Sequence, residues 1–138
     1  MLMKTVEVVA AIIVNDREFL CVQRGESPLD YISRKYEFPG GKIEVGETHE
    51  EALIRELYEE LCIDVVIEKL FLSVEHSYPD FKLVMHSYLC SAGSRNLQLT
   101  EHLEARWLPV DELETLDWAG ADLPIVEKLK DIYEQSDS

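Results

Sequence analysis

The alternation of apolar and polar residues divides the chain into short strands and two longer helices. Residues 6–14 (VEVVAAIIV) form a nearly continuous apolar run rich in β-branched residues, which predicts a strand buried on both faces. Asn15–Asp16 then turns the chain, and residues 19–23 return as the second strand of a hairpin. Further strands are predicted over residues 65–74, 83–90 and 107–109. A turn at Tyr78–Pro79–Asp80 separates the first two of these.

Helical periodicity marks two segments. Thr48 and Glu51 form the Ser/Thr-x-x-Glu arrangement that caps a helix start, so we place a helix over residues 49–61. A second helix begins at Asp122, which would cap it, with Pro124 in its first turn. Both helices have apolar faces that should pack inward, with Leu53, Leu57 and Leu61 in the first and Ile125, Val126, Leu129, Ile132 and Tyr133 in the second.

The mixture of strands and helices predicts an α/β (α+β) fold, in which a mixed β-sheet lies between helices. A short helix is also expected to begin at residues 110–113. At 138 residues the chain should form a single domain, residues 1–138, and we allow for a disordered tail from about residue 134.

The charge balance narrows the range of partners. Thirteen basic and 28 acidic residues give a net charge of −15, and no basic cluster interrupts it, which argues against a nucleic-acid polymer as partner. A single nucleotide stays compatible, because a bound metal reverses the local sign of the field. No apolar stretch reaches membrane-spanning length, and no signal peptide is evident. Three widely spaced cysteines without a CxxC pair indicate reduced structural thiols, so we expect a cytoplasmic protein, either a monomer or a homodimer.

The first helix carries an unusual group of carboxylates. Glu56, Glu59 and Glu60 stand at positions i, i+3 and i+4, which places them in one narrow stripe. Three acids aimed at one point repel one another unless a cation lies there, and Mg²⁺ prefers oxygen ligands and commonly bridges to substrate phosphates. The alternative is a solvated acidic face with no ligand.

A longer pattern contains these acids. The signature of the Nudix hydrolases resembles the pattern formed here by Gly41, Glu47 and residues 55–63 (RELYEELCI). One position departs from it, because Cys62 stands where the family has a glycine that ends the helix. That glycine adopts a left-handed backbone, which is unstrained only without a Cβ, so the geometry of this helix end is left open.

The resemblance implies roles for individual residues. The Gly40 carbonyl and the Glu56, Glu59 and Glu60 carboxylates would hold Mg²⁺, with Mn²⁺ as a substitute. Arg55 and Glu47 would orient the catalytic carboxylates, which is how groups behind the ligands fix a metal site. Several Nudix enzymes have a further glutamate near the metals in the loop before the tryptophan strand. Here Glu101 fits that position better than Glu104.

The general base stays open. Glu101 is one candidate, and Glu59 or Glu60 could serve instead of acting only as a ligand. His102, beside Glu101, titrates in the neutral range, although a lone loop histidine is more often solvated. The other three histidines are interpreted as structural or surface residues.

Over about residues 4–130 the chain is similar to the MutT branch of the family, which cleaves nucleoside triphosphates to a monophosphate and pyrophosphate. The MutT enzyme has an asparagine in the segment that matches Asp122. This chain has an aspartate there, like the cytidine-nucleotide relatives. An ionised carboxylate accepts hydrogen bonds and would pair with a base amino group, unless Asp122 only caps its helix. Four more residues are candidate substrate contacts, namely Arg24, Tyr36, Lys42 and Phe81.

The expected function is therefore Mg²⁺-dependent hydrolysis of a nucleoside triphosphate, with cytidine or oxidised nucleotides as candidate substrates. A nucleotide-sugar or dinucleotide pyrophosphatase is an alternative within the enzymes. Pro79 resembles a mark of the ADP-ribose group, but the MutT type carries the same turn. A non-catalytic nucleotide sensor is an alternative of another class, and it predicts loss of signature acids that are all present here.

Overall fold

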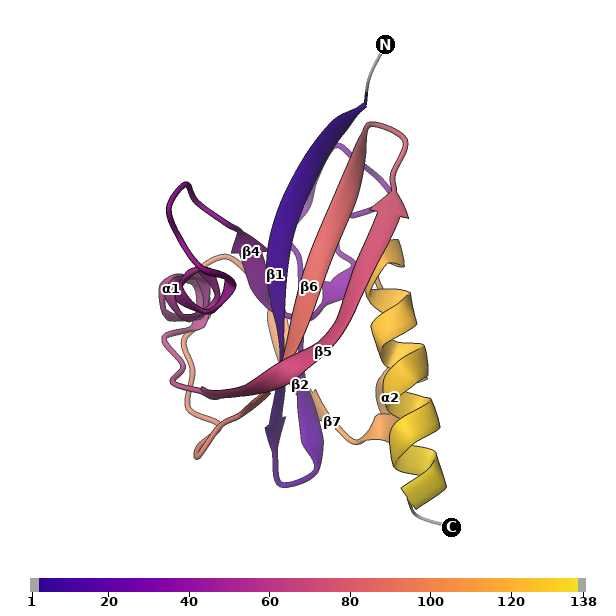
Figure 1. Ribbon diagram of the computed structural model, residues 1–138. Coiled ribbons are helices and arrows are strands. Elements are labelled where there is room, and N and C mark those ends of the chain that lie inside the picture. Colours follow the sequence, from indigo (N-terminus) through magenta and orange to yellow (C-terminus); the bar gives the residue numbers. More distant parts are fainter. Residues whose placement is uncertain (1–2, 137–138) are drawn as a thin grey trace.

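The computed structural model describes residues 3–136, which form a seven-stranded mixed sheet with one α-helix on each side (Figure 1). The strands are β1 (Lys4–Asn15), β2 (Glu18–Gln23), β3 (Tyr36–Glu37), β4 (Gly40–Lys42), β5 (Val66–Ser77), β6 (Phe81–Ser91) and β7 (Glu104–Leu108). The helices are α1 (His49–Leu61), α2 (Leu123–Ser136) and the short 3-10 helices η1 (Val110–Thr115) and η2 (Gly120–Asp122). None of the helices within residues 3–136 is long and apolar enough to cross a membrane.

Strand β1 organises the sheet because it has three partners. It runs parallel to β6 from the Lys4–Phe81 pair to the Val14–Ser91 pair. On its other edge it pairs with β4 at residues 8–10 and with β2 at residues 14 and 15, both antiparallel. The sheet order is β3-β2-β1-β6-β5, with β7 paired to β2. The glycine strand β4 is thus fixed to the middle of the molecule, next to α1.

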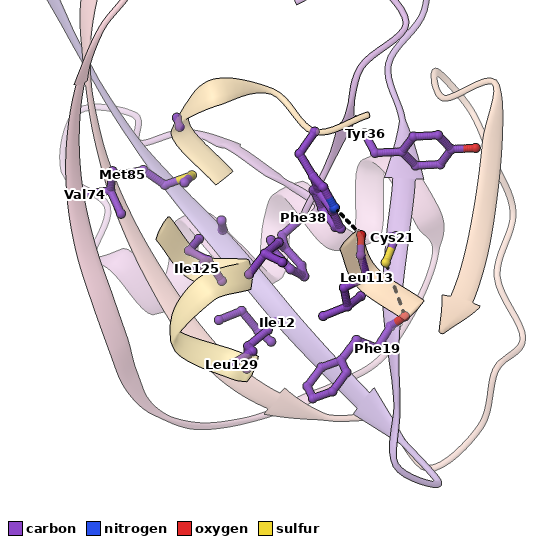
Figure 2. Close-up of a cluster of buried hydrophobic side chains, with 14 of the residues drawn as sticks. Ile12, Phe19, Cys21, Tyr36, Phe38, Val74, Met85, Leu113, Ile125 and Leu129 are labelled. Carbon is purple, nitrogen blue, oxygen red and sulfur yellow. Dashed lines mark hydrogen bonds between the residues drawn. The ribbon is translucent and has the colours of Figure 1, made fainter. Parts of the chain in front are cut away.

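The two faces of the sheet carry separate apolar cores, because β1 sends alternate residues to opposite sides. On one face, Ile12 of β1 packs with Ile125 and Leu129 of α2, as Figure 2 shows. On the other face, Val9 of β1 packs with three buried leucines of α1, which are Leu53, Leu57 and Leu61. Helix α1 therefore buries the face that its periodicity predicts. On α2 the predicted apolar face is buried at Ile125, Val126 and Leu129, whereas Ile132 is 46% exposed, so that part of the prediction was wrong.

The predicted elements are present, with changes at their ends. Helix α1 has the predicted bounds, whereas β5, β6 and β7 begin or end several residues from the predicted limits. The helix expected at residues 110–113 is the 3-10 helix η1. Helix α2 continues to Ser136, into the segment where disorder was allowed, and residues 137–138 lie outside the described residues. All three cysteines are free, and burial raises the pKa of Cys21 and of Cys90 to about 12.

Candidate active site

Local hydrogen bonds fix both ends of helix α1. At its start the Glu51 amide donates to Thr48 Oγ1 at 3.1 Å, and the Thr48 amide donates to Glu51 Oε1 at 3.0 Å. At its end Cys62 adopts a left-handed backbone with φ 51° and ψ 38°, and its amide donates to the Tyr58 carbonyl at 3.0 Å. Cys62 therefore takes the backbone shape of the usual glycine. The capping hydrogen bond at this end of α1 therefore forms without a glycine.

Arg55 is the centre of a hydrogen-bond network that holds the acids of α1. Its guanidinium donates two bonds to Glu47, from Nε to Oε2 at 2.7 Å and from Nη2 to Oε1 at 2.9 Å. Nη1 donates to Glu56 at 2.9 Å and to Glu59 at 3.3 Å, and Nη2 also reaches the Lys42 carbonyl at 3.0 Å. These bonds lower the pKa of Glu47 to about 2 and raise that of Arg55. The predicted pairing of Arg55 with Glu47 is present.

The two glycines of β4 allow a close approach that any side chain would block. A Cβ at Gly41 would lie 2.4 Å from the Glu56 carboxyl carbon, and a Cβ at Gly40 would lie 2.0 Å from the Val9 carbonyl oxygen. The Glu56 carboxylate therefore rests directly against the β4 backbone. The close packing of Gly40 on β1 holds that backbone in place.

A cleft of about 710 Å³ opens beside this network. Most of the predicted site residues line it, namely Arg24, Gly40, Gly41, Lys42, Glu56, Glu60, Phe81 and Glu101. Glu59 is not among its lining residues; its side chain is 56% exposed and bonded to Arg55. Sheet pairing and the loop before β7 thus bring together acids from distant parts of the sequence.

Glu60 has the most unusual environment of these acids. Its Oε2 atom is buried and has no hydrogen-bond partner among the described residues. Burial, followed by repulsion from Glu56 and Glu37, raises the pKa of Glu60 well above its usual range. A buried carboxylate oxygen without a donor, close to other carboxylates, fits a divalent cation, which would balance the charge and fill the missing contact. The residues present therefore fit the metal that the signature implies.

Two cleft residues were missed or misjudged from the sequence. Glu37 of β3 accepts bonds from Arg24 Nη1 at 3.0 Å and from His102 Nε2 at 3.1 Å. His102 was expected to be solvated, but its side chain is only 5% exposed, and its Nδ1 is buried without a partner among the described residues. Glu37 gave no sequence signal beyond its position just before the glycines. Arg24, predicted as a substrate contact, is held at the cleft by Glu37.

A smaller cavity of about 130 Å³ adjoins the cleft, and Asp122, Phe38 and Tyr78 are among the residues that line it. Asp122 directly precedes α2, as a cap would, but its Oδ1 accepts a bond from the Phe38 amide at 3.0 Å. Burial raises the pKa of Asp122 well above its usual value, which favours the neutral acid. The pairing of Asp122 with a base amino group stays a prediction.

The structure also places Tyr36 and the two candidate glutamates of the loop before β7. Tyr36 was a candidate substrate contact, but its side chain is buried in the core and its hydroxyl forms a hydrogen bond with Glu104. Phe38, two residues later, lines the small cavity instead. Glu104 also bonds Arg106, whereas Glu101 is exposed at the cleft, in line with the preference for Glu101.

The fold and the signature helix together define a Nudix domain, and comparison with known proteins agrees. The NUDIX domain family matches residues 3–129. The chain is 32% identical over 128 residues to the 8-oxo-dGTP diphosphatase of Escherichia coli (strain K12), which covers 93% of this chain and 98% of that protein. It is 34% identical over 125 residues to the CTP pyrophosphohydrolase of the same strain, covering 91% of each.

A solved structure shows the same likeness in three dimensions. The MutT protein of methicillin-resistant Staphylococcus aureus 252, a Nudix hydrolase, superposes with a TM-score of 0.71 at 39% identity, covering 92% of this chain and 96% of that one. The chain belongs to the Nudix hydrolase family.

Proposed function

We propose that this Nudix hydrolase is a Mg²⁺-dependent pyrophosphohydrolase that cleaves a nucleoside triphosphate to a monophosphate and pyrophosphate. The observation that carries the proposal is the buried, unpartnered oxygen of Glu60, set beside Glu56 at a cleft large enough for a nucleotide. The similarity to an 8-oxo-dGTP diphosphatase and to a CTP pyrophosphohydrolase supports a triphosphate as the substrate class.

The carboxylates of Glu56, Glu59 and Glu60 and the Gly40 carbonyl would hold the metal, with Glu101 as a further ligand. Bound Mg²⁺, or Mn²⁺ in its place, supplies charge neutralisation for the polyphosphate and polarises the phosphorus under attack. Arg55 would orient Glu56 at the cleft through its bond to that carboxylate, and Glu59, which is also bonded to Arg55, would have to turn toward the cleft to join it. Glu47 in turn holds Arg55.

The other cleft residues would bind and orient the nucleotide. Arg24 and Lys42 place positive charge beside the acids, where phosphate oxygens would lie. Phe81 lines both the cleft and the small cavity, so a base entering that cavity would pass beside its ring. Glu101 is our candidate for the general base, because it is exposed at the cleft.

A product assay tests the reaction. The protein with Mg²⁺ is incubated with the ribo- and deoxynucleoside triphosphates, their oxidised forms and ADP-ribose, and the products are separated. Monophosphate and pyrophosphate from a triphosphate support the proposal. Cleavage of ADP-ribose alone would make the protein a nucleotide-sugar hydrolase. Binding without turnover across the panel would make it a sensor.

Glu60→Gln should lower kcat by orders of magnitude, because the neutral amide cannot balance the cation. Without metal at pH 8, the raised pKa keeps Glu60 largely protonated in the folded protein, whereas it ionises on unfolding, which favours the unfolded state. Gln has no such ionisation, so the variant should be more stable than the native protein, by about 1 kcal/mol after allowance for partial exposure. Glu127→Gln is a matched control, since Glu127 is exposed on α2. Near-native turnover of Glu60→Gln in Mg²⁺ would remove the metal-cluster account.

Asp122→Asn tests the role of the small cavity in base selection. The amide oxygen can still accept from the Phe38 amide, so the fold should persist. We expect the ratio of kcat/KM values between cytosine and guanine nucleotides to change about tenfold or more, since a buried polar mismatch discriminates strongly. An unchanged base profile would restrict Asp122 to a structural role.

A further inference from the structure

A second cluster of metal-ligand side chains lies away from the acids of the cleft. Glu7 of β1, His49 at the start of α1 and His86 of β6 each place one ligand atom within 4.8 Å of the others. Val6 and Val8, the strand neighbours of Glu7, line the cleft. Because alternate strand residues point to opposite faces, Glu7 faces the other side of β1. The two groups of ligand atoms are therefore separate.

The two imidazoles are held in one arrangement by contacts on three sides. Their rings stack with centroids 4.4 Å apart and an interplanar angle of 22°. His49 Nδ1 is bonded to the Tyr88 hydroxyl at 2.8 Å, and His86 Nδ1 to Ser73 Oγ at 2.8 Å. His86 Nε2 lies 2.9 Å from Glu7 Oε2. Hydrogen bonds to the distal ring nitrogen are how ligating histidines are usually oriented.

We propose that Glu7, His49 and His86 form a binding site for a borderline transition-metal cation, with Zn²⁺ as its best-matched ion. Two imidazoles and one carboxylate are a donor set that Zn²⁺ accepts, with a fourth position left for water. Zn²⁺ ligands lie about 2.0–2.2 Å from the ion, so donor atoms that now lie within 4.8 Å of one another would adjust their positions around it. Glu7 and His49 are at the surface or partly so, which leaves room for that movement.

The charges around the cluster favour a cation. Glu7 supplies one negative charge, and the chain as a whole is strongly acidic, so a cation is attracted to this face. Mg²⁺ prefers oxygen ligands and would not compete well for two nitrogens.

A bound ion would add a shared ligand centre to three elements that already meet through strand pairing and side-chain hydrogen bonds. It would tie the first residue of α1, the helix with the catalytic acids, to β1 and β6, which run side by side in Figure 1. The expected consequence is that Zn²⁺ raises the Tm. Within residues 3–136, no hydrogen bond or ion pair links this site to the acids of the cleft, so Mg²⁺-dependent turnover should not require it.

Titration of untagged protein with Zn²⁺, in a Cys62→Ala background and in excess Mg²⁺, tests the site. The substitution removes the exposed thiol, and excess Mg²⁺ is added to fill the proposed metal site at the cleft. Imidazole NMR signals of His49 and His86 should move at one equivalent of Zn²⁺, while those of His76 and His102 stay in place. The Tm should rise over the same range.

Variants separate this site from incidental binding. His49→Gln combined with His86→Gln should abolish both responses, whereas the control His76→Gln should keep them. Tyr88→Phe, which removes only the hydroxyl at His49 Nδ1, should weaken Zn²⁺ binding about tenfold or more. Unmoved His49 and His86 signals, or an unchanged Zn²⁺ response in the double variant, would overturn the proposal even if the triphosphate assay succeeds.

Discussion

At the scale of single residues, environment gives identical side chains opposite properties. Glu47 and Glu60 are both acids of the signature region, yet the pKa of Glu47 is lowered to about 2 and that of Glu60 is raised. Glu47 receives two hydrogen bonds from Arg55. Glu60 instead has a buried oxygen with no donor among residues 3–136, and several acids lie nearby. The environment of Glu47 therefore suits an ion pair with the Arg55 guanidinium, whereas the environment of Glu60 suits a metal cation taken up from solution.

Glu47→Gln should destabilise the fold at neutral pH and weaken metal binding, because Arg55 loses its charged partner. The folded pKa of about 2 lies below the ordinary value of 4.5, so the contribution is complete above about pH 4.5 and is lost as the pH falls toward 2. Urea unfolding of native and variant protein should show curves that converge over that range. Mn²⁺ affinity should fall by about 10–100-fold at neutral pH.

The exposed Glu75–Lys82 pair provides the control for that experiment. Its atoms are 3.7 Å apart at the surface, and such pairs contribute little. Glu75→Gln should therefore leave both stability and metal affinity nearly unchanged. A difference between native protein and Glu47→Gln that persists undiminished at pH 2 would contradict the ion-pair explanation.

At the scale of elements, helix α1 is capped at both ends, packs one face on the sheet and presents acids on another. The Thr48–Glu51 bonds set its start, and its buried leucines set its rotation against the sheet. Rotation and start together decide where Glu56 and Glu60 point. The glycine strand β4 then sets how closely the acids approach the backbone. Both elements are needed to form the cleft wall.

Cys62→Gly should stabilise the protein by about 1 kcal/mol, because a left-handed backbone strains a residue with a Cβ and does not strain glycine. Cys62→Ala is the matched control, since it removes the thiol and keeps the Cβ. Urea unfolding should therefore place Cys62→Ala close to native protein and Cys62→Gly above both. Equal stability of the two variants would show that the φ of 51° stores no strain.

At the scale of the whole molecule, a net charge of −15 is carried by a chain of 138 residues. Apolar burial in the two cores on either side of the sheet stabilises the fold against repulsion among the excess acidic side chains. Raising the NaCl concentration from about 0.01 M to about 1 M shortens the screening length from about 30 Å to about 3 Å. Stability should respond, because self-repulsion opposes the compact state.

We therefore expect the Tm in EDTA at pH 7 to rise by several degrees over that salt range. Near the sequence pI of 4.5 the net repulsion disappears, and the rise should be much smaller. Differential scanning calorimetry at the two pH values measures both. An equal response at pH 7 and at pH 4.5 would assign the salt effect to something other than net charge.

The sequence alone determined the features that depend on neighbours along the chain. The bounds of α1 follow from a capping box and a four-residue apolar repeat, and the stripe of Glu56, Glu59 and Glu60 follows from helical spacing. The same pattern identified the Nudix signature, and with it the pairing of Arg55 with Glu47. These features are local, so they could be predicted without knowledge of the sheet.

The tertiary structure decided what depends on pairing between distant segments. Glu37 meets Arg24 and His102 because β3 pairs with β2, to which β7 is also paired. The same packing buries Asp122 and leaves one oxygen of Glu60 without a donor. It also stacks His49 on His86, two residues read from the sequence as separate structural or surface groups. Burial and long-range contact have no local periodicity, so only the folded chain could establish them.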